Sequence, residues 1–186
     1  GAFPAHYDNA GPPSKRAVTA VLYLGTEGGW TRGCGGELVL APFLRRGVAV
    51  APTRNRVAFF RSDRVLHWVR PWTGAKPRYC CSFWFDGACV NSRDETVLTK
   101  DVLRFSSWDA CAEFFSKSPL QRTISRAVYA STYEATLAAC VDDGDALAKM
   151  TEGHERHVAA IEGQLRPMVA ELRRRAGELG PPVALN

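Results

Sequence analysis

Two histidines and an aspartate in the first half of the chain have the residue types and spacing of a metal site. His6 and Asp8 are two positions apart, so in an extended segment their side chains point to the same side. His67 follows within a segment typical of a β-strand. Two imidazoles and one carboxylate can occupy one face of an octahedral metal and leave three positions open. A His-x-Asp triplet is also common by chance, so the triplet alone does not decide between a metal site and an unrelated pattern.

An arginine and a tyrosine could add an anion-binding element to this site. Arg78 lies on the next expected strand after His67, and a guanidinium holds a carboxylate through two parallel hydrogen bonds. Tyr23 lies on the strand expected after the His-x-Asp segment and could donate another hydrogen bond. Taken singly, Arg78 is better explained as a surface charge and Tyr23 as a core aromatic residue. Only their combination with the histidines favours a binding site.

The first half of the chain has the pattern of short β-strands that must position these residues. Runs of β-branched, aromatic and aliphatic residues are bounded by Gly, Pro, Asn or Asp, and no helical periodicity separates them. This pattern predicts an antiparallel sandwich or barrel. The expected strands are 18–24, 37–40, 47–50, 56–60, 65–69 and 79–85.

The second half has the pattern of α-helices. Ser107 is expected to cap a short helix, and Ser118-Pro119 is a typical helix start. An apolar stripe at steps of three and four follows, which Pro167 should kink or split and Gly180 should end. The two longer helices could pair as a hairpin, and 87–104 reads as a connecting segment. The expected helices are 107–115, 120–138 and 147–179.

Six blocks occur in order within residues 3–86. They are His6-Tyr7-Asp8-Asn9, AVLYL at 20–24, GGELVL at 35–40, NRVAFFRSD at 55–63, VLHWVRP at 65–71 and RYCCSFWF at 78–85. This series resembles the catalytic core of the 2-oxoglutarate- and Fe(II)-dependent oxygenases. Within that superfamily it is most similar to the prolyl 4-hydroxylase branch, which includes the enzymes that act on hypoxia-inducible factor.

The resemblance implies a role for each of the candidate residues. His6, Asp8 and His67 would bind Fe(II), and Arg78 and Tyr23 would hold the distal carboxylate of the cosubstrate 2-oxoglutarate. The implied reaction consumes dioxygen, and ascorbate is implied as the reductant that keeps the iron in its reduced state. The implied activity is hydroxylation of a protein or peptide, with proline as the expected target and 4-hydroxylation as the expected reaction.

Two further residues of the last strand fall on the same face as Arg78. Ser82 matches a family position that carries a hydroxyl, so it could add a hydrogen bond to 2-oxoglutarate. Trp84 could wall the substrate pocket or could be a packed core residue. Nucleic-acid demethylases of this superfamily usually carry a second arginine at the position of Trp84, so this residue argues against them.

The resemblance also implies a fold and some departures from it. We expect a double-stranded β-helix, or jelly-roll barrel, over residues 1–90 and an α-helical extension over residues 105–180. Only five residues precede His6, whereas the family core begins with strands before this point. We therefore expect an N-terminally truncated chain that lacks at least the first strand. The helical extension has no counterpart that the resemblance names.

Two other motifs have simpler explanations than a functional site. His154 and His157 are three positions apart, which is not the four-residue spacing of the zinc-protease motif. The segment 33–36, Gly-Cys-Gly-Gly, is too short for a phosphate loop and precedes a strand rather than a helix.

Charge and composition narrow the classes of partner. The 186 residues have a net charge of +5, and residues 1–90 hold 12 Lys and Arg against 5 Asp and Glu, a net charge of +7. Such a field favours anionic ligands and hence an acidic peptide. No basic run with interleaved aromatic residues indicates nucleic acid, and no apolar run is long enough for a membrane helix. The six cysteines form no CxxC pair and predict free thiols in a reducing compartment, the cytoplasm or nucleus.

Three functions therefore compete. The first is a peptidyl-proline hydroxylase, and the second is a related oxygenase that acts on a small molecule or a modified nucleobase. The third is a truncated, non-catalytic interaction module in which the helices are the working part. The complete set of metal and cosubstrate residues favours an enzyme.

Overall fold

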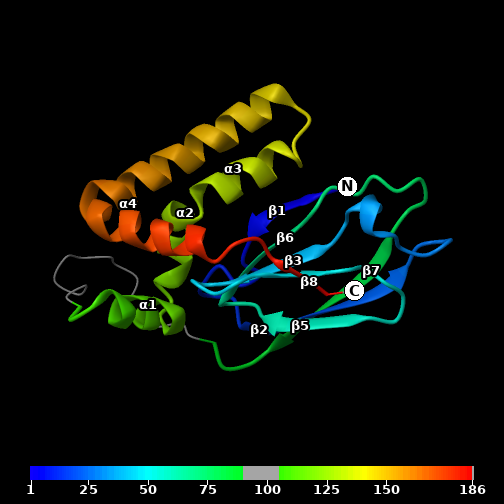
Figure 1. The fold of residues 1–186 in the computed structure, drawn as a ribbon, viewed down its shortest axis with the longest axis horizontal. Helices are drawn as coiled ribbons and strands as arrows, with labels where there is room; N and C mark the ends of the chain where they lie inside the picture. The colour runs from blue at the N-terminus through cyan, green and yellow to red at the C-terminus, as the bar shows by residue number, and fades with distance from the viewer. Residues whose placement is uncertain (90–104, 186) are drawn as a thin grey trace.

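The computed structural model of this protein describes residues 1–89 and 105–185. The first half consists of short strands with one 3-10 turn, and the second half consists of helices and a final strand (Figure 1). The strands are β1 (Phe3–His6), β2 (Arg16–Gly25), β3 (Leu38–Pro42), β4 (Val48–Val50), β5 (Val57–Arg61), β6 (Val65–Val69), β7 (Tyr79–Asp86) and β8 (Val183–Leu185); the 3-10 turn η1 is Arg32–Cys34. The helices are α1 (Trp108–Lys117), α2 (Gln121–Val128), α3 (Ala130–Ala138) and α4 (Gly144–Glu178).

The strands form two sheets that face each other. The five-stranded sheet has the order β1-β6-β3-β4-β8, and the three-stranded sheet has the order β5-β2-β7. All pairings are antiparallel except that of β4 with β8. The prediction of a β-rich, mainly antiparallel first half is therefore confirmed. Among the described residues, the strands do not form one closed barrel, so the jelly-roll assignment stays a prediction.

Alternating side chains form the core between the two sheets. In β5, Ala58 and Phe60 are buried while Val57, Phe59 and Arg61 are exposed, as expected for a strand with one face against a core. Apolar residues of both sheets meet in this core: Val21, Tyr23, Leu38, Val50, Ala58 and Phe60.

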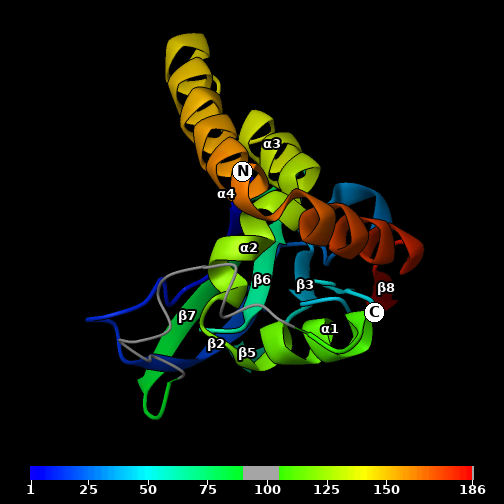
Figure 2. The ribbon, with the colours of Figure 1, turned by 90° about the vertical axis from the view of Figure 1, so that its left-hand side faces the viewer.

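The helices cover the other face of the five-stranded sheet (Figures 1 and 2). Leu66 of β6 is fully buried against Ala5 of β1 and Tyr133 of α3, whereas the neighbouring His67 points to the opposite face. A second apolar core lies among the helices and includes Phe43 from the β3–β4 turn. The five-stranded sheet therefore lies between the helical layer and the three-stranded sheet.

Several predicted helix features are confirmed at the level of single residues. The Ser107 hydroxyl accepts a hydrogen bond from the Ala110 backbone at 3.1 Å and caps α1. The long helix α4 is kinked, with non-helical backbone angles at Leu165, two residues before Pro167. Figure 2 shows its two parts at an angle to each other.

Two predictions for the second half need correction. The expected helix 120–138 is interrupted at Tyr129, whose backbone leaves the helical region and divides it into α2 and α3. The strand β8 was not predicted, because Gly180 and the two prolines after it mark only the end of a helix. In the structure they turn the chain so that Val183 pairs in parallel with Val48 of β4. Most of the expected connecting segment 87–104 lies outside the described residues.

All six cysteines are free, which confirms the prediction of free thiols. None of the described helices is both long enough and apolar enough to cross a membrane.

A candidate metal centre between the two sheets

The three predicted metal ligands meet at one point. His6 and His67 are register partners on the neighbouring strands β1 and β6, and their ring centroids are 4.1 Å apart. Asp8 follows the end of β1 and places Oδ1 3.3 Å from His6 Nε2 and Oδ2 3.7 Å from His67 Nε2. Within the described residues, this is the one cluster of at least three His, Cys, Asp or Glu side chains whose ligand atoms all lie within 4.8 Å. One cation could therefore contact all three.

Backbone carbonyl groups orient both imidazole rings. His6 Nδ1 lies 2.8 Å from the Pro4 carbonyl oxygen, and His67 Nδ1 lies 3.1 Å from the Val65 carbonyl oxygen. A carbonyl can only accept, so in both rings Nδ1 carries the hydrogen and Nε2 keeps its lone pair. In metal sites, a bond of this kind fixes the ring and its tautomer. Both histidines therefore present Nε2 as a ligand.

Hydrogen bonds hold Asp8 in its ionised form. The Thr19 hydroxyl donates to Asp8 Oδ2 at 2.6 Å and itself lies 2.7 Å from the Ser62 hydroxyl, which must then be the donor. Burial opposes the ionisation of Asp8, but its close contact with the His6 ring, the hydrogen bond from Thr19 and the nearby His67 imidazole outweigh it and lower its pKa.

Burial keeps His67 neutral. It is 4% exposed, and burial together with the neighbouring His6 lowers its pKa to about 4. An ionised carboxylate and a neutral imidazole are the forms that bind a metal. The donor set of two nitrogens and one carboxylate fits Fe(II) with open positions.

The three ligands lie on the wall of a cavity of about 620 Å³ between the sheets. Its other lining residues include every residue that the sequence analysis assigned to the cosubstrate. The full lining is Gly1, Ala2, Phe3, His6, Asp8, Thr19, Val21, Tyr23, Leu38, Phe60, His67, Val69, Trp72, Pro77, Arg78, Cys80, Ser82 and Trp84.

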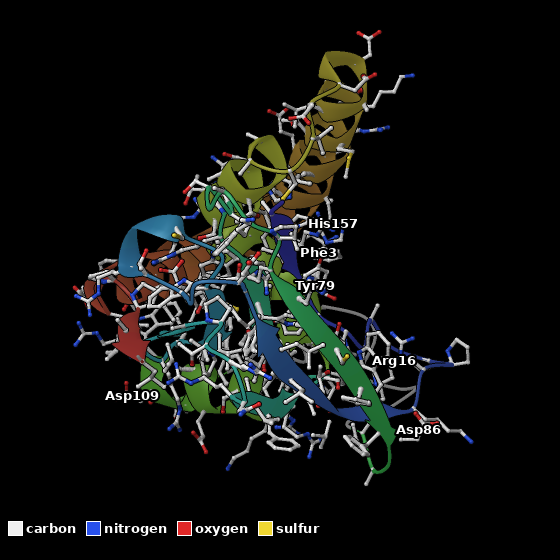
Figure 3. The ribbon with its side chains drawn as sticks, turned by 90° about the vertical axis from the view of Figure 1, so that its right-hand side faces the viewer. Phe3, Arg16, Tyr79, Asp86, Asp109 and His157 are labelled. Carbon is white, nitrogen blue, oxygen red and sulfur yellow. The ribbon has the colours of Figure 1, made fainter. Side chains whose placement is uncertain are left out.

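Strand register explains how Tyr23 and Ser82 reach this cavity. β7 runs antiparallel to β2 from Tyr79 to Asp86, as Figure 3 shows, with Ser82 opposite Val21. Side chains alternate along a strand, so residues 78, 80, 82 and 84 all line the cavity. The predicted shared face of β7 is therefore present in the structure.

Arg78 and Tyr23 form a cationic, hydrogen-bonding end of the cavity. The Arg78 guanidinium carbon lies 5.9 Å from the Tyr23 ring centroid. No described carboxylate forms an ion pair with Arg78, so its charge is available to an anion. Tyr23 is 1% exposed, and burial raises the pKa of its phenol, which therefore stays protonated and able to donate.

Gly36 makes room for this arrangement. Its φ is +75°, and a Cβ there would lie 2.7 Å from the Trp72 ring and 3.2 Å from Arg78. The glycine-rich segment therefore serves packing beside the cavity. Sequence reasoning missed Trp72 and Thr19 as cavity residues. The sequence signal for Trp72 was the glycine pair at 35–36, because in the structure Gly35 pairs with Trp72 in an isolated bridge.

Trp84 and the histidine pair of α4 have different surroundings. Trp84 lines the cavity but is 47% exposed, with the Arg16 guanidinium 4.5 Å from its ring, so it is a rim residue rather than a core residue.

His154 is buried and stacks on Tyr133, and its Nε2 lies 3.7 Å from Glu134 Oε1. His154 and His157 form no metal cluster with other described residues.

Comparisons with known proteins find a matching family and several similar structures. The family model described as the 2OG-Fe(II) oxygenase superfamily matches residues 1–86. A solved prolyl 4-hydroxylase from Phytophthora capsici is similar with 39% identity and a TM-score of 0.77. That match covers 95% of this chain and 58% of the other, so the chain spans less than two thirds of the Phytophthora protein.

Two other solved structures match a smaller part of the chain. A prolyl hydroxylase from Trichoplax adhaerens, solved with a peptide fragment of the hypoxia-inducible factor oxygen degradation domain, has 32% identity, a TM-score of 0.40 and coverage of 46% of this chain and 37% of that one. A prolyl 4-hydroxylase from Pseudomonas putida has 30% identity, a TM-score of 0.41 and coverage of 47% and 46%. Among curated proteins, no sequence matches this chain.

The β-rich region matches the 2OG-Fe(II) oxygenase superfamily over residues 1–86, and the His6–Asp8–His67 cluster lies within the matched residues. The chain is similar to prolyl hydroxylases, since the structure of a prolyl 4-hydroxylase matches nearly its whole length. Because 95% of the chain is covered, the helical half, for which the resemblance named no counterpart, also has one in that structure.

Proposed function

We propose that this chain carries the catalytic centre of an Fe(II)- and 2-oxoglutarate-dependent dioxygenase, and that its reaction is 4-hydroxylation of proline in a polypeptide. The observation that carries the proposal is the cavity in which the His6–Asp8–His67 cluster and the Arg78–Tyr23 pair face the same space. The likeness to a prolyl 4-hydroxylase along nearly the whole chain supports the choice of proline.

In this proposal, His6 Nε2, His67 Nε2 and an Asp8 oxygen hold Fe(II). When bound, the iron would supply the reduction of dioxygen coupled to oxidative decarboxylation of 2-oxoglutarate, which gives succinate, carbon dioxide and one hydroxyl group on the substrate. Thr19 would keep Asp8 oriented through its hydrogen bond to Oδ2. The mainly apolar walls of the cavity would limit access of water to the reacting atoms.

Arg78 and Tyr23 would bind the distal carboxylate of 2-oxoglutarate. The guanidinium can offer two parallel hydrogen bonds, and the protonated phenol can offer a third. The Ser82 hydroxyl, on the same face of β7, would add a hydrogen bond to this molecule. Ascorbate would be the external reductant of the iron.

The proposal extends to the rest of the molecule. We propose that residues 1–90 form a double-stranded β-helix core and that residues 105–180 form its helical extension. The partner would be a protein or peptide, acidic in character because of the positive first half, with no nucleic acid or membrane partner. The free cysteines support an intracellular location, in the cytoplasm or nucleus.

The test is an assay of the full-length protein that contains this chain, with Fe(II), 2-oxoglutarate, ascorbate and a library of proline-containing peptides. We expect a mass gain of one oxygen on proline, with one succinate formed for each product. Asp8→Ala should abolish both tight metal binding and turnover, because it removes the only anionic ligand. Robust oxidation of a free small molecule without any peptide product would favour the second function. Metal binding without turnover on any substrate would favour the interaction module.

A further inference from the structure

A second cavity of about 480 Å³ lies between the helical layer and the segment that follows β1. His6 lines both this cavity and the one that contains the metal centre, so the two spaces are neighbours. Figure 3 shows His157 of α4 beside the N-terminal strand that carries Phe3. The lining residues are Ala5, His6, Tyr7, Ala10, Gly11, Pro12, Pro119, Leu120, Arg122, Thr123, Arg126, Tyr133 and His157.

The charges that line this cavity are all of one sign. Arg122 and Arg126 are one turn apart on α2. His157 also lines the cavity from α4, but partial burial and the nearby Arg126 lower its pKa, so it adds no charge. No aspartate or glutamate is among its described lining residues. Residues four apart share a helix face, so both guanidinium groups reach the same space. The cavity is therefore suited to an anion.

The two arginines differ in what they already contact. Arg126 lies 4.8 Å from the Tyr133 ring and places Nη1 3.3 Å from His154 Nδ1, which orients it. Arg122 Nη1 is buried and has no hydrogen-bond partner among the described residues. A buried donor without an acceptor is unfavourable, because it has lost its water without compensation. An anionic oxygen in the cavity would provide that acceptor.

We propose that this cavity binds a carboxylate side chain of the polypeptide substrate, a few residues from the residue that enters the metal centre. This inference rests on the proposed function for the identity of the substrate as a polypeptide. An extended peptide advances about 3.3 Å per residue, so a chain lying across His6 could reach both cavities. The cavity would then select acidic peptides, and Arg122 would be the main contact.

The experiment is a direct binding measurement that needs no turnover. Two fluorescent peptides of alanine with a central proline would be compared, one with three glutamates beside the proline and one with three glutamines, on the full chain loaded with Mn(II) and 2-oxoglutarate. We expect the glutamate peptide to bind more tightly and Arg122→Gln to weaken it about tenfold, the size expected for one charge-assisted hydrogen bond. Arg122→Lys, which keeps the charge, should lose less.

A matched control is Arg166→Gln, which removes an exposed positive charge of α4 outside the cavity and should change neither peptide. Equal affinity for the two peptides, or equal loss in the Arg122 and Arg166 variants, would overturn the proposal. Arg122-dependent binding of inorganic phosphate with no preference between the peptides would also overturn it, in favour of a small anion. Peptide selection without any hydroxylation would count against the proposed reaction alone, whereas hydroxylation without peptide selection would count against this cavity alone.

Discussion

Replacing Arg78 by lysine should weaken the binding of 2-oxoglutarate about tenfold. Lysine keeps the positive charge but cannot form the two parallel hydrogen bonds of a guanidinium. A hydrogen bond to a charged group contributes about 1.5–3 kcal/mol, and 1.4 kcal/mol corresponds to a factor of ten in affinity. Arg78 is only half-buried, so we expect the lower end of this range.

Tyr23→Phe tests the other half of the same contact. It removes one hydrogen bond to the charged carboxylate, which contributes about 1.5–3 kcal/mol, so affinity should fall about tenfold to a hundredfold. If both side chains hold the same carboxylate, the double variant should depart from the sum of the single effects by about 0.5 kcal/mol or more. The distance of 5.9 Å between Arg78 and the Tyr23 ring makes such coupling expected.

Calorimetric titration of 2-oxoglutarate into the Mn(II)-loaded protein measures these affinities without turnover. Arg54→Lys is the matched control, because Arg54 is exposed and does not line the cavity. The unfolding midpoint of each variant shows whether a lower affinity for 2-oxoglutarate results from loss of the folded structure. An unchanged affinity in a folded Arg78→Lys protein would remove Arg78 from the site and refute the reasoning.

Three other substitutions or measurements test separate parts of the structure. Gly36→Ala should lower the free energy of unfolding by about 1–3 kcal/mol more than Gly28→Ala does. Both glycines have positive φ, but only at Gly36 would the new Cβ lie 2.7 Å from an aromatic ring. Equal losses in denaturant titrations would contradict this. Cys80 lines the cavity and Cys81 does not. Metal and 2-oxoglutarate together should therefore slow the labelling of Cys80 by iodoacetamide at least severalfold and leave the labelling of Cys81 unchanged, as measured by mass spectrometry. Equal protection of the two thiols would place both outside the site. Tyr7→Phe should lower the free energy of unfolding by about 1–2 kcal/mol, because it leaves a buried serine hydroxyl without its partner at 2.8 Å; unchanged stability would mean that this bond contributes nothing.

The sequence was sufficient for β2 to β7 and for the site residues that it predicted, all of which line the cavity. Turn residues delimit β2, β5 and β6, because Gly, Pro, Asn or Asp lies at or close to the end of each strand, and alternation gives the single buried face of β5. The face of β7 follows from the same period of two, which correctly groups Ser82 and Trp84 with Arg78. Whether these residues bind iron and 2-oxoglutarate stays a prediction.

Other features depend on contacts between distant segments, which local patterns do not contain. β8 exists because Val183–Leu185 finds the free edge of β4, and three exposed residues carry no periodic signal. The break at Tyr129 is likewise set by tertiary contacts, since its hydroxyl accepts a hydrogen bond from the Leu44 backbone at 2.9 Å. Thr19 looked like an ordinary strand residue, and only the approach of Asp8 gives its hydroxyl a role.

The helical half helps to hold in place the segment that carries two of the candidate metal ligands. Tyr7, between His6 and Asp8, is absent from the lining of the cavity that holds these two side chains, and its hydroxyl lies 2.8 Å from the Ser125 hydroxyl of α2. The Ala5 backbone donates to the Thr136 hydroxyl of α3 at 3.0 Å. Among the described strands, β1 pairs only with β6 and lies at the edge of the sheet, so the sheet alone would hold it on one side. Because the helices hold it on the other side, the positions of both ligands depend on α2 and α3, and an anion bound at Arg122 of α2 would act on the same support.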